Sequence, residues 1–99
     1  MTYYAKGAAY EREFIAEMDR KGFDGFRTAG SHTQIDVILI KRQTCPANTS
    51  AVILCQCKRV KKNPPKPSKG FKELHTWPFI AKWWVLREDG KKTEITEVE

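Results

Sequence analysis

The chain has 99 residues, enough for one domain with a modest hydrophobic core. Hydrophobic residues make up 40% and aromatic residues 11%, which excludes general disorder. Eighteen Lys and Arg against twelve Asp and Glu give a net charge of +6, which favours a polyanionic partner such as nucleic acid over a merely solubilising basic surface.

Neither a membrane segment nor a disulfide framework is expected. No apolar run approaches the ~20 residues of a membrane span, and the stretch MTYYAKGAAYERE lacks the apolar centre of a secretory signal. The cysteines Cys45, Cys55 and Cys57 form no CxxC pair and match no common zinc spacing. We therefore expect a cytoplasmic protein with reduced thiols and no membrane partner.

Residues 5–21 are predicted to form an amphipathic helix, with Ile15 and Met18 on its apolar stripe and Gly22 as its stop. At about 100° per residue, Glu11 falls inside that stripe. A carboxylate in this position either bends out to water or needs a partner, which a metal ion or a lysine would supply.

Three strand candidates follow the helix, at Phe26–Ala29, Gln34–Arg42 and Ser50–Arg59. The second is a nearly continuous apolar run, as in a strand covered on both faces, and it has Asp36 near its start. The third carries its polar residues at its end.

Residues 61–70, KKNPPKPSKG, contain three prolines and four lysines and are predicted to form a flexible basic loop. A short helix, a fourth strand and a hairpin into a last strand then complete the single domain 1–99, with the expected bounds Ser68–Trp77 (Ser68 as N-cap), Phe79–Glu88 and Thr93–Val98. The order α, β, β, β, α, β, β indicates a mixed α/β layer structure.

Polar side chains near the end of the third predicted strand form a candidate site. Strand alternation puts Gln56 and Lys58 on one face and Cys57 on the other. If the second and third strands are antiparallel neighbours, Asp36 lies beside Gln56 and Lys58. The first helix, packed across the same face, would then add Glu11.

The segments KGAAYERE, GFDGFRTAGSHTQID and VILCQCK, taken in this order over residues 6–60, resemble the archaeal Holliday junction resolvases of the PD-(D/E)XK nuclease superfamily. The resemblance implies a small restriction-endonuclease-like fold, with a mixed central β-sheet flanked by helices. It further implies that Glu11, Asp36 and Lys58 match the active-site acids and lysine of the family. The chain departs from the family pattern at Gln56, where the family has glutamate.

The resemblance also implies a set of nucleic-acid contacts. Lys6, Arg12 and Arg27 match basic residues near the phosphate backbone, and Ser31 matches a serine in the loop that enters the site. The remaining expected DNA-binding residues are Arg59, Lys61 and Lys62, at the end of the third strand and in the basic loop.

Phosphodiester hydrolysis of this type calls for a divalent cation, Mg²⁺ or Mn²⁺, held by oxygen ligands. The expected ligands are Asp36, the side-chain oxygen of Gln56 and the backbone carbonyl of Cys57, with Glu11 binding directly or through water. Lys58 would orient the nucleophile or stabilise the phosphoryl charge. A glutamine oxygen is neutral, so we expect weaker metal binding unless Glu73 or direct ligation by Glu11 replaces the missing charge.

The expected function is therefore a metal-dependent, structure-selective DNA endonuclease that acts as a homodimer on branched or four-way junction DNA. One alternative is a DNA-binding protein of the same fold that has lost cleavage through Gln56. A second alternative, a general basic interaction domain, predicts no convergence of the four candidate side chains.

Overall fold

The structure, a computed structural model, describes residues 3–28, 34–42, 51–74 and 80–98. Its elements, in chain order, are α1 (Tyr3–Arg20), β1 (Phe23–Arg27), β2 (Val37–Lys41), β3 (Val52–Val60), α2 (Lys69–Lys72), β4 (Ile80–Glu88) and β5 (Glu94–Val98). The order and type of the predicted elements are confirmed. Within the described ranges, no helix is long and apolar enough to cross a membrane.

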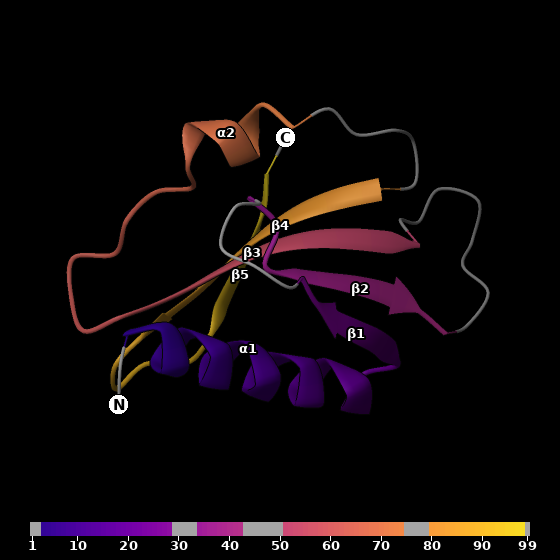
Figure 1. The fold of residues 1–99 in the computed structure, drawn as a ribbon, viewed down its shortest axis with the longest axis horizontal. Coiled ribbons are helices and arrows are strands. Elements are labelled where there is room, and N and C mark those ends of the chain that lie inside the picture. Colours follow the sequence, from indigo (N-terminus) through magenta and orange to yellow (C-terminus); the bar gives the residue numbers. More distant parts are fainter. Residues whose placement is uncertain (1–2, 29–33, 43–50, 75–79, 99) are drawn as a thin grey trace.

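The strands form one five-stranded mixed sheet in the order β1-β2-β3-β4-β5. All neighbouring pairs are antiparallel except β3 and β4, which are parallel and are connected by the segment that contains α2. Gly90, with a φ of 84°, lies in the turn between β4 and β5 and takes a left-handed conformation that glycine adopts without strain. Figure 1 shows α1 on one side of the sheet and α2 on the other.

The main hydrophobic core lies between α1 and the sheet. Tyr10, Phe14 and Met18 of α1 pack with Cys55, Cys57 and their neighbours on the same face of the strands. The prediction that α1 packs across the face of Gln56 and Lys58 is therefore wrong. Residues of β3 alternate between faces, and α1 buries the face that carries Ile53, Cys55 and Cys57, whereas Gln56 and Lys58 lie on the other face.

Strand β1 begins at Phe23, three residues before the predicted start, because it pairs with β2 along its whole length, from Phe23 opposite Lys41 to Arg27 opposite Val37. Gly25 faces α1 in this strand. A Cβ at this position would lie 2.9 Å from Ile15 Cγ2, so glycine permits the close approach of helix and strand.

Helix α2 packs on the opposite face of the sheet and is shorter than predicted. Ser68 caps its first turn as expected, accepting a hydrogen bond from the backbone N–H of Phe71. The helix ends at Lys72 because Lys82 of β4, only 5% exposed, donates from Nζ to the carbonyls of Phe71, Lys72 and Leu74. The remainder of the predicted helix, residues 75–77, lies outside the described residues.

A cleft at the start of strand β2

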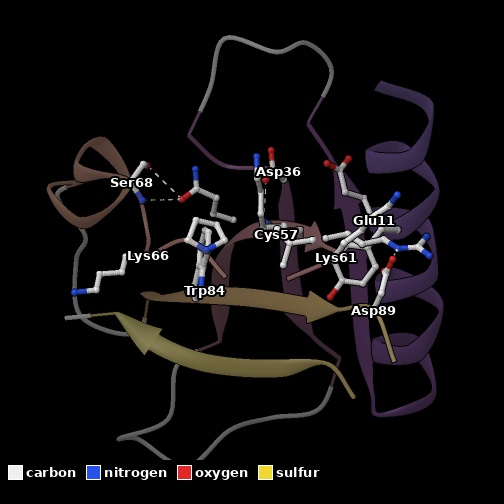
Figure 2. A pocket seen from close by; sticks show the side chains of 14 residues that line it. Glu11, Asp36, Cys57, Lys61, Lys66, Ser68, Trp84 and Asp89 are labelled. Carbon is white, nitrogen blue, oxygen red and sulfur yellow. Dashed lines mark hydrogen bonds and ion pairs between the residues drawn. The ribbon is translucent and has the colours of Figure 1, made fainter. Parts of the chain in front are cut away.

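A cleft of about 880 Å³ opens where β2 begins and the neighbouring strand β3 continues past it to Val60. Its lining comes from α1, from the residue just before β2, from β3, from the basic loop and from β4 and the turn after it (Figure 2). The lining residues are Tyr10, Glu11, Asp36, Gln56, Cys57, Lys58, Arg59, Val60, Lys61, Pro65, Lys66, Ser68, Trp84 and Asp89. The four residues predicted to converge, Glu11, Asp36, Gln56 and Lys58, all belong to this set.

Asp36 lies just before the first residue of β2. The antiparallel pairing of β2 with β3 ends with Val37 opposite Cys55, so one further step places Asp36 beside Gln56, as predicted. Asp36 Oδ2 accepts a hydrogen bond of 2.8 Å from the backbone N–H of Cys57. The carboxylate thus satisfies a backbone donor of β3 beyond the last residue pair of the ladder.

The pKa of the Asp36 carboxyl is set by burial and by the charged groups around it. Burial raises the pKa of the Asp36 carboxyl above its ordinary value, and the negative charge of Glu11 raises it further. The Cys57 N–H and the ammonium of Lys58 oppose this rise in pKa. Lys58 therefore already compensates part of the negative charge that Asp36 and Glu11 bring to this partly buried site.

Glu11 has an arginine as its partner, where the sequence suggested a metal ion or a lysine. Arg27 donates from Nε to Glu11 Oε1 over 3.0 Å, and both side chains are mostly buried, with 26% and 17% exposed for Arg27 and Glu11. The pair links the middle of α1 to the end of β1. Arg27, predicted to contact the phosphate backbone, thus also fixes one of the acids of the cleft.

Gln56 lines the cleft, but its carboxamide is engaged on the side of α2. Its Oε1 lies 3.4 Å from the backbone nitrogen of Ser68 and 3.3 Å from the Ser68 hydroxyl, and its Nε2 donates to Gln34 Oε1 over 3.5 Å. Figure 2 shows these contacts to Ser68 at the far end of the cleft from Glu11. The predicted metal ligand therefore has other partners in this structure.

Cys57 offers only backbone groups to the cleft. Its thiol lies in the core beneath α1, and burial raises the thiol pKa strongly. In a strand, the N–H and C=O of one residue point to the same side, so the Cys57 carbonyl faces the side on which Asp36 takes its N–H. This orientation is compatible with the predicted role of the carbonyl as a metal ligand.

The predicted DNA-binding residues divide into those that line the cleft and those that do not. Arg59 and Lys61 line it, and Arg59 also pairs with Asp89 over 3.3 Å. Arg12 and Lys62 are exposed outside it. Ser31 and the side chain of Lys6 lie outside the described residues, so their predicted roles stay predictions.

Glu73, considered as a substitute acid, is the C-cap of α2 and lies 3.9 Å from Lys69 without lining the cleft. The cleft residues to which the sequence assigned no role in the site include Trp84 and Ser68, whereas Lys66 belongs to the predicted basic loop. Ser68 was predicted only as a helix cap. Its second role in holding Gln56 depends on where α2 packs, for which the sequence offers no local signal.

The cleft offers oxygen atoms, which are the type of ligand that a hard divalent cation binds. It combines the carboxylates of Glu11 and Asp36 with the Gln56 amide oxygen and the Cys57 carbonyl, all of them oxygen donors of the type that Mg²⁺ prefers. Among the described residues, no group of three or more His, Cys, Asp or Glu side chains could hold a metal ion. The set therefore fits Mg²⁺ by ligand type and carries little negative charge.

Comparison of the chain with protein-family models, with curated proteins and with solved structures finds no match. The coarse fold, an α/β domain with a five-stranded mixed sheet, is what the structure itself establishes. The resemblance to the archaeal Holliday junction resolvases rests on the three sequence segments quoted above.

Proposed function

We propose that this protein is a metal-dependent endonuclease that hydrolyses phosphodiester bonds in branched or four-way junction DNA, with the restriction-endonuclease-like fold of the resolvases that it resembles. One observation carries the proposal: Glu11 of α1, Asp36 just before β2 and Lys58 of β3 line the same cleft. A general basic interaction domain gives no physical reason for this convergence.

When bound, a divalent cation would polarise a phosphoryl oxygen and lower the pKa of an attacking water. Asp36 and Glu11 would hold it, with the Cys57 carbonyl as a neutral ligand. Arg27 keeps Glu11 oriented through its 3.0 Å ion pair. Lys58, whose charge already acts on Asp36, would orient the nucleophile and stabilise the phosphoryl oxygens.

The basic loop would hold the nucleic-acid backbone above this centre. Lys61 and Lys66 line the cleft, and Lys62 stands exposed beside it. Contacts of lysine with phosphate provide affinity without reading base sequence, as expected for an enzyme selective for DNA structure. Symmetric cutting of a junction needs two active sites, so a twofold homodimer belongs to the proposal.

A second candidate is a DNA-binding protein of the same fold without cleavage. It is favoured by the state of Gln56, which has no negative charge and whose oxygen faces two Ser68 donors. Both candidates predict salt-sensitive DNA binding, so binding alone does not separate them. They differ in whether the cleft supports hydrolysis.

The test is incubation of labelled four-way junction, linear duplex and single strand with Mg²⁺ or Mn²⁺. Wild type is compared with Asp36→Asn, Lys58→Ala and Lys92→Ala, the last being a control at an exposed lysine outside the cleft. The proposal expects junction cleavage by wild type and Lys92→Ala only. The same background level of cleavage from all four proteins would contradict the proposal that the protein is an enzyme.

The variant Gln56→Glu decides between the two candidates. Cleavage by wild type that rises with the added carboxylate indicates an active enzyme with a weakened metal site. Cleavage that appears only in Gln56→Glu indicates a natural protein that binds DNA without cutting it.

A further inference from the structure

Ser68 connects the basic loop, helix α2 and the cleft. It follows Pro67 at the end of the loop, caps α2 through the Phe71 N–H, and lines the cleft. Its hydroxyl lies 2.8 Å from Gln34 Oε1 and 3.3 Å from Gln56 Oε1. A hydroxyl has one proton to donate, and the shorter distance makes Gln34 Oε1 its nearer acceptor, with Gln56 Oε1 as the longer second contact. The Ser68 backbone nitrogen, 3.4 Å from Gln56 Oε1, is a second donor on the same side.

The position of Ser68 is fixed from both sides. Lys82 holds the carbonyl end of α2 against the sheet, and Phe71 of the same helix is fully buried. Gly70 lies against Gln34: a Cβ on Gly70 would be 3.0 Å from Gln34 Cδ. The Ser68 donors therefore face Gln56 from a helix that is anchored to the sheet.

We propose that Ser68 is a positioning residue that holds residue 56 on the α2 side of the cleft, and that a cation at Asp36 and Glu11 recruits the Gln56 oxygen only by displacing it from Ser68. This inference rests on the proposed function, because it concerns the same metal site. It identifies a contact within the free protein that opposes metal binding, separate from the missing charge of Gln56.

The expected magnitude is modest because the contacts are long. Gln56 Oε1 lies 3.3 Å from the Ser68 hydroxyl, which is longer than an ordinary O–H···O hydrogen bond, so one full neutral hydrogen bond is the upper bound of its contribution. Loss of one such neutral contact corresponds to about a fivefold change in an equilibrium constant. Removing the hydroxyl should thus tighten cation binding by about that factor.

The test measures Mn²⁺ affinity by water-proton relaxation, without nucleic acid and without an activity readout. Ser68→Ala removes the hydroxyl and the helix cap, whereas Ser68→Gly removes the hydroxyl and leaves a residue that still caps helices well. Ser68→Thr, which keeps both functions, is the matched control. Both hydroxyl-deficient variants should bind Mn²⁺ about fivefold more tightly than wild type and Ser68→Thr.

The variant Asp36→Asn distinguishes a failure of the role proposed for Ser68 from a failure of the proposed function. Mn²⁺ binding that is lost in Asp36→Asn but equal in wild type and Ser68→Gly overturns the role of Ser68 and leaves the proposed function standing. Mn²⁺ binding that is insensitive to Asp36→Asn overturns both. As a second readout, the Gln56 side-chain NH₂ signals should shift on Ser68→Gly and shift again on Mg²⁺ addition, and unchanged signals in Ser68→Gly would contradict the proposal.

Discussion

Lys82→Met should destabilise the protein by detaching the carbonyl end of α2 from the sheet. Lys82 is 5% exposed, and its three N–H donors match three carbonyl acceptors, those of Phe71, Lys72 and Leu74, each within 3.3 Å. Methionine keeps a comparable apolar stem and removes the ammonium. The carbonyls then lose the partner that replaces a further helical turn.

The change in the free energy of unfolding for Lys82→Met is the sum of two opposing contributions. Hydrogen bonds from a charged donor contribute about 1.5 kcal/mol or more each, so their loss costs about 5 kcal/mol in total. Methionine carries no charge, so the folded variant avoids the several kcal/mol that burying the Lys82 ammonium costs in lost hydration. We expect a net loss of about 2 kcal/mol in the free energy of unfolding, which lowers Tm by on the order of 10 °C in a domain of this size.

The assay is urea denaturation followed by tryptophan fluorescence, with native-state hydrogen exchange as a local probe. Lys92→Met, at an exposed position in the β4–β5 turn, is the control and should keep wild-type stability. The amides of Phe71 and Glu73, bonded to Ser68 and Lys69, should exchange faster in Lys82→Met. A stability loss below about 0.5 kcal/mol, within the usual range of surface substitutions, would show that the Lys82 ammonium does not anchor α2.

Two further predictions concern the basic loop and the buried thiols. Replacing Lys61 and Lys66 with alanine should weaken DNA binding and reduce the slope of log K against log salt by about 2, whereas an unchanged slope would exclude phosphate contacts by these lysines. Burial raises the pKa of Cys55 to about 12 and raises that of Cys57 as well, which suppresses the reactive thiolate at pH 8. In a Cys45→Ser background, the folded protein should resist a thiol-specific disulfide reagent until denaturant is added, and rapid reaction of the folded protein would contradict this burial.

The pairing of Asp36 with Gln56 was predictable because it depends on strand periodicity and on an antiparallel connection between consecutive strands. The side of the sheet that α1 covers could not be predicted in this way. Residues 52–55 of β3 are apolar on both faces of the strand, and Gln56 is the first polar side chain. The sequence therefore did not show which face of the sheet α1 would bury. Glu11 nevertheless reaches the cleft because β3 extends past the start of β2, where the edge of the sheet opens toward α1.

The partners of the cleft side chains were harder to predict than their positions. The Glu11–Arg27 pair joins residues on two elements whose packing angle determines whether the side chains meet. The contact of Ser68 with Gln56 depends on where Lys82 and Phe71 anchor α2. Such contacts follow from tertiary packing, and local sequence patterns carry no signal for them.

The most direct test of the proposed metal site is anomalous diffraction at the manganese edge from crystals soaked in MnCl₂. We expect a manganese peak in the cleft within about 2.5 Å of an Asp36 carboxylate oxygen, and no such peak in Asp36→Asn crystals treated in the same way. A cleft without a manganese peak, in crystals that bind manganese elsewhere, would contradict the assignment of Glu11 and Asp36 as the cation-binding acids.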